Sequence, residues 1–161
     1  MKGFVQDGAL RSKEIVKSSR CGACGLAKNN WCCTPKMAVQ GKGKRKIMFV
    51  LPPVSKEEDQ SGKFLHHKKG RWLRTLLQRQ GVDTFEDCWF TSALICHSEK
   101  FDTKNLEYCQ FMLERTIEEK KPTTIIPIGY EAIRSVIGMT SGLKVKQGDR
   151  WVGWRIPAQK R

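Results

Sequence analysis

The sequence predicts an α/β protein, a three-layer sandwich around a central, mostly parallel, four-stranded sheet. Short apolar runs rich in β-branched residues alternate along the chain with amphipathic stretches at helical spacing. This alternation favours parallel strands joined by right-handed helical crossovers. A chain of 161 residues is long enough to bury one core but short for two, so we expect a single domain over residues 1–161.

The first half of the chain is predicted to hold two helices and one strand. Residues 9–18 have the apolar spacing of a short helix. The apolar run Ile47–Leu51 is a predicted buried strand, which stops at Pro52-Pro53 because neither proline can donate to a strand ladder. The loop that follows is a candidate site, since ligands of open α/β sheets bind beyond the carboxyl ends of strands. A helix then extends to a C-terminal Gly81, with apolar residues at helical spacing: Trp72, Leu73, Leu76 and Leu77.

The second half is predicted to hold three strands and two helices. Proline and glycine residues separate these elements, as expected for residues that interrupt regular structure. They are a strand at residues 88–95, an amphipathic helix at 105–120, a strand at 123–128, a helix from Gly129 to Gly138 and a last strand at 151–156.

Positive charge is concentrated at the two ends of the chain. Of the formal net charge of +14, residues 1–46 hold 11 Lys and Arg against 2 acids, and residues 144–161 hold 6 against 1. The 97 residues between them balance at 13 of each. These blocks favour a polyanionic partner, most simply nucleic acid. The alternative is a solubilising surface or a disordered basic tail.

One further basic cluster lies inside the balanced part, where no acid occurs from Gln60 to Val82. We expect this cluster and the segment before the first strand to contact DNA phosphates. The expected DNA-binding residues are Lys63, Lys68, Lys69, Arg71, Arg74, Lys42, Lys44 and Arg45. Trp31 is the expected base-stacking residue, and the other tryptophans are expected to pack mainly in the core or in loops.

The chain has seven cysteines. Their odd number and the Cys21-x-x-Cys24 pair favour metal or cluster ligation over a secreted disulfide framework. Cys88 is expected to be a small buried residue of its strand. Because the sequence has no hydrophobic signal segment and no long apolar run, we expect a soluble, cytoplasmic protein with no membrane partner.

Two metal sites are compatible with the cysteine spacing. Cys21 and Cys24 share a turn, whereas Cys96 follows a predicted strand and Cys109 lies near the start of a helix. Four thiolates of this kind suit a 4Fe–4S cluster. The competing set, for zinc, is Cys21, Cys24, Cys32 and Cys33. Adjacent cysteines are poor partners for one tetrahedral ion, but spacing alone leaves both sites open.

The order of these motifs resembles the iron–sulfur uracil-DNA glycosylases, family 4 and the related family 5. The matching stretches are CGAC, MAVQGKGKRKIMFV, EEDQSGKF, a cysteine after a strand, a cysteine opening a helix, and IIPIGYEAI, over roughly residues 20–156. The resemblance implies the family's three-layer α/β sandwich. It also implies that Cys21, Cys24, Cys96 and Cys109 hold a 4Fe–4S cluster.

The active-site positions depart from the family. The family's acidic residue, in the loop after the first strand, is matched by Pro52, which has no titratable group. The asparagine that pairs with the uracil edge is matched by Ser92, which is too short for the same contact. The aromatic residue that stacks on the base is matched by Phe64 or, without a gap, by Leu65. The family's late histidine motif would begin at about Lys160-Arg161, where this chain stops.

The acid, the base-reading asparagine and the late histidine are all missing, and together these losses predict a catalytically inactive module that still binds DNA. The cluster is then expected to have a structural role, holding the N-terminal segment and the loop between Cys96 and Cys109 against the sheet. Glycosylase-like domains occur with viral replication polymerases, so the resemblance implies a phage or viral accessory of DNA replication or repair, with a polymerase as a further partner.

Two alternatives stay open. One is an active base-excision glycosylase with non-standard residues, drawn from His66, His67, Glu57 and Glu58; a further C-terminal segment would supply the missing histidine. The other is a zinc-dependent binding protein with no role on DNA.

Overall fold

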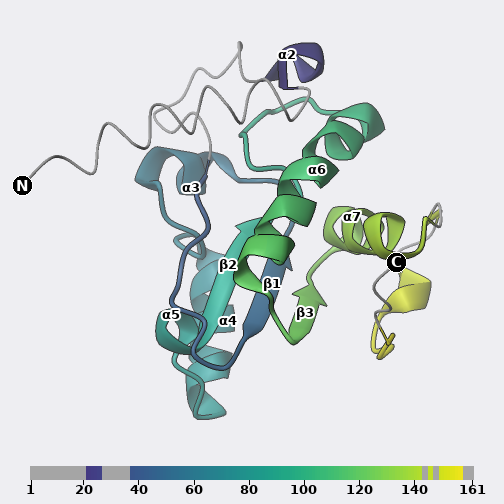
Figure 1. Ribbon diagram of the computed structural model, residues 1–161. Coiled ribbons are helices and arrows are strands. Elements are labelled where there is room, and N and C mark those ends of the chain that lie inside the picture. Colours follow the sequence, from purple (N-terminus) through teal and green to yellow (C-terminus); the bar gives the residue numbers. More distant parts are fainter. Residues whose placement is uncertain (1–20, 27–36, 143–144, 147–148, 158–161) are drawn as a thin grey trace, which may run out of the picture.

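The centre of the molecule is a parallel sheet (Figure 1). A computed structural model describes residues 21–26, 37–142, 145–146 and 149–157. In these residues the sheet has three strands in the order β2-β1-β3. The central strand β1 (Ile47–Leu51) pairs in parallel with β2 (Cys88–Ser92) and β3 (Thr124–Pro127).

Helices join the strands in the order that parallel pairing requires. Three helices lie between β1 and β2, one long helix lies between β2 and β3, and another follows β3. In chain order the described helices are α2 (Cys21–Cys24), α3 (Lys56–Ser61), α4 (Lys68–Arg79), α5 (Thr84–Asp87), α6 (Thr103–Lys120), α7 (Tyr130–Ser141) and the 3-10 helix η2 (Asp149–Trp151).

Neighbouring residues of β1 belong to two separate hydrophobic cores. Phe49 and Leu51 pack in one core with Phe90, whose ring stacks on Phe49 at a centroid distance of 5.1 Å. The helices that cover this core contribute Leu73, Leu77 and Phe85. Val50 packs in the other core, under α6 and α7, with Leu106, Leu113, Ala132 and Val136. Helices therefore cover both faces of the sheet, and the predicted α/β class is confirmed.

Local sequence explains where two helices begin and end. Ser55 caps α3, because its Oγ accepts the Glu58 N–H at 3.3 Å while Glu58 Oε2 accepts the Ser55 N–H at 3.2 Å. Gly62 then ends α3 in the left-handed conformation, with a φ of 64°. Asp102 and Asn105 form the same reciprocal cap at the start of α6.

Between residues 47 and 141 the predicted strands and helices are confirmed in place, with changes at their ends. The first strand has the predicted bounds, whereas β2 stops pairing at Ser92 although the buried run continues to Cys96. The helix predicted to end at Gly138 continues to Ser141, and the left-handed Gly142 ends it. Glycine inside a helix costs only about 1 kcal/mol, which the surrounding packing offsets.

The prediction of a fourth strand at residues 151–156 is wrong. The described residues 149–157 hold η2 and a turn, with Gly153 at a φ of 81° and no strand. Trp151 packs against Ile133 and Ile137 of α7. The residues around this contact form the 3-10 helix and the turn that follows it, in place of an extended strand. The predicted helix at residues 9–18 lies outside the described residues.

The expectation that the tryptophans are mainly packed fails at two positions. The side chain of Trp72 is 66% exposed and that of Trp154 is 74% exposed. Trp72 lies on the helix face opposite Leu73 and Leu77, so the packed face of α4 cannot bury it. Trp31 lies outside the described residues.

Candidate metal centre and nucleic-acid surface

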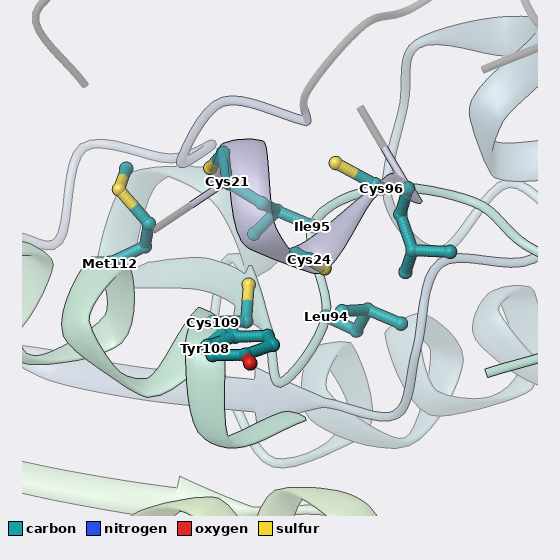
Figure 2. Close-up of a pocket in the computed structure, with 9 residues that line it drawn as sticks. Cys21, Cys24, Leu94, Ile95, Cys96, Tyr108, Cys109 and Met112 are labelled. Carbon is teal, nitrogen blue, oxygen red and sulfur yellow. The ribbon is translucent and has the colours of Figure 1, made fainter. Parts of the chain in front are cut away.

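The four cysteines predicted to hold a cluster line one pocket (Figure 2). They come from three separate segments: α2, the loop beyond β2, and α6. The other lining residues are Leu26, Leu94, Ile95, Tyr108 and Met112. The pocket therefore combines four sulfur donors with mainly apolar walls.

The sequence brings these segments together for local reasons. The single turn of α2 presents both Cys21 and Cys24, and α2 packs against α6. Leu94 is 1% exposed and anchors the loop that carries Cys96 in the core under α6. Cys109 lies two turns into α6, on the side that packs against this same core.

One side chain holds α2 against α6. Asn105 Nδ2 donates to Cys24 O at 3.2 Å and lies 3.3 Å from Cys24 Sγ. The amide is itself oriented by its reciprocal cap with Asp102, whose N–H donates to Asn105 Oδ1 at 2.8 Å. An N–H directed at a ligand sulfur is the usual partner of a metal-bound thiolate.

The Cys109 thiol has the most perturbed environment. Its pKa is raised to about 12, chiefly by burial and to a smaller extent by the nearby Cys96, Cys21 and Cys24, against a backbone hydrogen bond with Ile95 that lowers it. The thiols are thus close enough to influence one another. A metal bound here replaces these protons.

The pocket offers four thiols, the donor type that both a 4Fe–4S cluster and zinc take. Within the described part of the chain, no three Cys, His, Asp or Glu side chains are grouped to hold one metal ion. Four thiolates that each bond a different iron stand further apart than four thiolates on one ion. Cys32 and Cys33, the other half of the competing zinc set, lie outside the described residues. Cys88 is fully buried in the opposite core, as expected.

Two predicted base-pocket positions lie together at the strand tips. Ser92 Oγ lies 2.5 Å from Pro52 O and 2.9 Å from Leu94 O, and it accepts the Leu94 N–H at 3.2 Å. Pro52 also packs at the start of α7, where a Cβ on Gly129 would lie 3.1 Å from Pro52 Cγ. Ser92 and Pro52, two of the positions predicted to form a base pocket, therefore contact each other or neighbouring main-chain groups at the strand tips.

The other two base-pocket positions are core residues. Phe64 and Leu65 are 1% and 2% exposed. The Phe64 N–H donates to Gln40 Oε1 at 3.0 Å, while Gln40 Nε2 donates to Gly62 O at 2.8 Å. Leu65 has a φ of 60°, which is uncommon for a large residue, so the loop is held by its surroundings.

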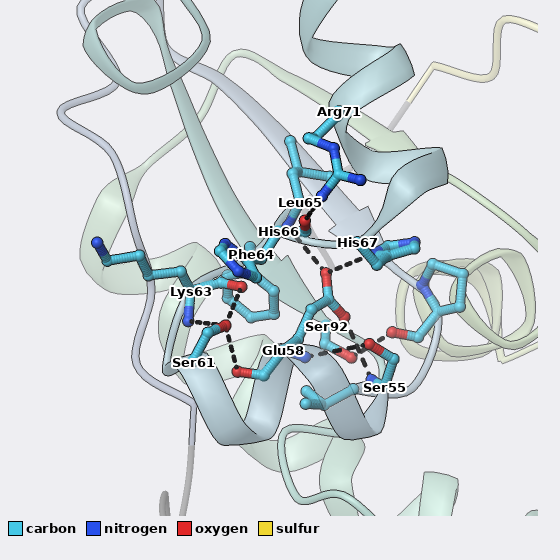
Figure 3. A network of polar contacts seen from close by, with 12 residues as sticks. Ser55, Glu58, Ser61, Lys63, Phe64, Leu65, His66, His67, Arg71 and Ser92 are labelled. Carbon is cyan, nitrogen blue, oxygen red and sulfur yellow. Dashed lines mark hydrogen bonds and ion pairs between the residues drawn. The ribbon is translucent and has the colours of Figure 1, made fainter.

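Three of the four catalytic candidates, Glu58, His66 and His67, lie in a polar network beside this loop (Figure 3). Glu58 is 4% exposed, and besides capping α3 its Oε1 accepts the Leu65 N–H at 2.9 Å. His67 Nδ1 lies 3.4 Å from the same oxygen, close enough for an ion pair but without a hydrogen bond. His66 is exposed, and its carbonyl accepts from Arg71 Nη1 at 2.6 Å. Glu57 is exposed, and hydrogen bonding at the helix start lowers its pKa.

Three of the predicted DNA-binding cations are already paired with acids. Lys42 and Lys44 lie 2.6 and 2.7 Å from the two oxygens of Glu86, and Arg45 Nε lies 3.1 Å from Asp87 Oδ2. Their positive charge is therefore partly neutralised before any partner binds.

The predicted cations around α4 have a different environment. These cations are Lys63, Lys68, Lys69, Arg71 and Arg74. Among the described residues, no acid forms an ion pair with any of the five. All five are exposed. Arg74 stacks over the Phe85 ring at 5.6 Å, and Arg71 donates to the His66 carbonyl rather than to an acid. The exposed Trp72 among them is the residue that the sequence reasoning missed, because it lies four residues before Leu76 and so shares the apolar pattern of the helix.

The fold and pocket define an α/β protein with a four-cysteine pocket beyond the carboxyl end of β2. Comparison of the sequence with protein-family models and with curated proteins gives no match to either. Of the helices in the described residues, none combines the length and apolarity needed to cross a membrane.

Proposed function

We propose that this protein is a DNA-binding module that holds a 4Fe–4S cluster on a uracil-DNA glycosylase-like scaffold and lacks the family's base excision. The observation that carries the proposal is the pocket that gathers Cys21, Cys24, Cys96 and Cys109 from distant parts of the chain. These are the cysteines that the family resemblance selects. Chance rarely places four of seven cysteines around one pocket.

The surroundings of the pocket support a cluster with a structural role. Apolar walls limit the access of water, and the Asn105 amide directed at Cys24 Sγ stabilises a thiolate. The cluster, when bound, supplies four iron–thiolate bonds that join α2, the loop after β2 and α6. The chain's own part is to present the thiolates and to hold α2 on α6 through Asn105.

The strand tips support the loss of base excision. Pro52 offers no acid to activate water, and the Ser92 hydroxyl is occupied by main-chain groups of the strand tips. Glu58 is engaged by two backbone N–H groups, which leaves it poorly placed to act as a base. The exposed cations of α4 supply the contacts to DNA phosphates.

The cluster is tested by anaerobic purification of wild type, Cys96→Ala and Cys88→Ala. We expect about four irons and matching sulfide per chain in wild type and in Cys88→Ala, and loss of both in Cys96→Ala. Cys88 is the matched control because it is an equally buried cysteine outside the pocket. A colourless protein with one zinc, indifferent to Cys96→Ala, would refute the cluster.

The loss of base excision is tested by a base-release assay on single- and double-stranded DNA containing uracil or other modified bases. We expect DNA binding without base release. Release that disappears in His67→Ala or Glu58→Gln would establish the alternative, an active glycosylase with non-standard residues.

A further inference from the structure

The exposed face of α4 carries a single aromatic residue within a row of polar and basic side chains. Helical geometry places residues three or four apart on the same face, so Lys68, Trp72, Thr75 and Arg79 form one row. All four are exposed, and Arg71 lies beside the row. At 1.5 Å per residue the row is about 16 Å long.

The scaffold holds this row rigidly. Gly70 lies so close to the loop before it that an added Cβ would come within 2.4 Å of Leu65 Cα. Leu73 and Leu77 attach the opposite side of α4 to the core. Arg74 is fixed over the Phe85 ring. The exposed side chains therefore project from a helix that cannot shift easily.

Among the described residues, the ring of Trp72 has no aromatic or cationic stacking partner. In the described part of the chain, no aromatic pair and no cation–π contact includes it. An exposed large apolar side chain on its own needs no explanation. Here, however, it stands in a stretch without acids, from Gln60 to Val82, among cations free of ion pairs to described acids.

We propose that this face of α4 binds single-stranded DNA, with Trp72 stacking on a base and the flanking Lys68, Arg71 and Arg79 contacting phosphates. The proposal rests on the proposed DNA-binding function and names the form of DNA. A stacking ring needs an accessible base face, which a single strand offers and a stacked duplex does not. The alternation of aromatic and basic groups matches the alternation of base and phosphate.

The exposed residues of α4 fit a protein partner or a membrane less well than they fit single-stranded DNA. A helix that docks in a protein groove presents apolar anchors at i, i+3, i+4 and i+7. From Trp72 the positions i+3, i+4 and i+7 are Thr75, Leu76 and Arg79, so only Leu76 is a further apolar residue, and it is half-buried, whereas Thr75 and Arg79 are exposed. A helix that lies on a membrane needs a broad apolar face, and the apolar face of α4 is already packed against the core.

The test measures binding of one oligonucleotide of roughly 16 nucleotides as a single strand and as a duplex, on the holoprotein. We expect wild type to prefer the single strand. Trp72→Ala should weaken single-strand binding roughly 5- to 150-fold and duplex binding much less. Trp72→Phe should retain most of the affinity, whereas Trp72→Leu, which keeps apolar area but no ring, should not. Trp154→Ala is the control, as an equally exposed tryptophan off α4.

The charge contribution is measured by salt dependence. Lys68→Ala and Arg79→Ala should each reduce the slope of log K against log salt by about 0.7 on the single strand. Because all of these positions are exposed, circular dichroism should be unchanged in every variant.

The outcomes separate the two proposals. Duplex preference, or equal losses of both DNA forms in Trp72→Ala, overturns the single-strand assignment and leaves DNA binding intact. Retention by Trp72→Leu shows that apolar burial, rather than stacking, binds the partner, and also overturns it. Absence of binding to either form refutes the DNA-binding function itself.

Discussion

Ser92 shows how one hydroxyl can connect main-chain groups at the tips of two neighbouring strands. Its hydroxyl lies between the carbonyls of Pro52 and Leu94 and accepts the Leu94 N–H. All of these groups are at the carboxyl ends of β1 and β2. A hydroxyl is short enough to join main-chain groups here, whereas an asparagine side chain would extend past them.

Ser92→Ala should lower the free energy of unfolding by about 1–3 kcal/mol, because it leaves the buried Leu94 N–H without its acceptor. Urea unfolding measures this. Ser98→Ala is the control, since Ser98 Oγ donates to an exposed carbonyl and its loss should cost under about 0.5 kcal/mol. Equal values for the two variants would contradict the role of Ser92.

Glu58 and Glu57 are neighbours with different expected costs. Glu58→Ala removes the acceptor of both the Ser55 and Leu65 N–H groups, so we expect a loss of about 2–3 kcal/mol in unfolding free energy. Glu57→Ala changes an exposed side chain and should cost less than about 1 kcal/mol. Chemical denaturation of both variants compares them directly, and a larger loss for Glu57→Ala would refute this account of the loop.

At the scale of elements, α5 pairs its acids with three basic residues of the segment before β1, which are among the predicted DNA-binding cations. Glu86 lies against both Lys42 and Lys44, and hydrogen bonds from these two lysines lower its pKa. The folded carboxyl therefore titrates below its unfolded value. Its stabilising effect is present above the unfolded pKa and is lost as the pH falls through the lowered folded pKa. The pair is intact at neutral pH.

Glu86→Gln should release Lys42 and Lys44 for phosphate contacts at neutral pH. We expect tighter DNA binding and a steeper salt dependence, by up to roughly 1.4 in the slope for two added contacts on a single strand. Titrations at several salt concentrations measure this. Glu119→Gln, which removes an exposed acid on α6 next to Lys120, is the control with the same charge change. The same slope in both variants would mean that only net charge matters.

Elements differ in how well the sequence predicts them. Ile47–Leu51 is a continuous apolar run that is followed directly by two prolines. The local signals therefore agree, and the strand is predicted with its observed bounds. The end of α7 is not, because Gly138 and Gly142 are both plausible ends and only packing decides between them. Residues 151–156 alternate like a strand, but the contact of Trp151 with α7 overrides that pattern. Tertiary contacts of this kind have no local signal.

The candidate site shows the same division. Spacing left the zinc and cluster ligand sets open, and the order of motifs selected four cysteines that the fold gathers at one pocket. Pairing of Lys42, Lys44 and Arg45 with Glu86 and Asp87 could not be foreseen, since it depends on how a loop meets α5. Periodicity alone does not mark Trp72 as exposed, because it lies four residues before Leu76 in the same apolar pattern, and the side of α4 that meets the core decides its exposure.

At the scale of the whole molecule, the pocket lies at the edge of the core under α6 and α7, because Leu94 and Cys109 line the pocket and also pack in or against that core. The cores use β1, β2, α4, α6 and α7, and they are formed without α2. Only Leu26, just after α2, packs at the margin of one core. The sheet should therefore fold independently of the metal.

Removal of the cluster should expose α2 and the first turns of α6 while leaving the sheet protected. Hydrogen exchange of holoprotein and apoprotein measures this, with faster exchange expected at residues 21–26 and 103–109 and unchanged protection in β1. Asn105→Ala should produce part of the same effect in the holoprotein, because it removes the contact with Cys24. Loss of protection throughout β1 would mean that the cluster is required for the fold.

The close approach of α4 to the loop before it also determines which substitutions α4 tolerates. At Gly70 even a methyl group would collide with the Leu65 backbone, whereas Lys68, Trp72 and Thr75 face solvent. In a library of all single substitutions, selection for folded protein alone would deplete variants at position 70 and spare those around it. Selection for DNA binding would then remove changes at Trp72 as well. The difference between the two selections would separate, residue by residue, what α4 does for the fold from what it does for a partner.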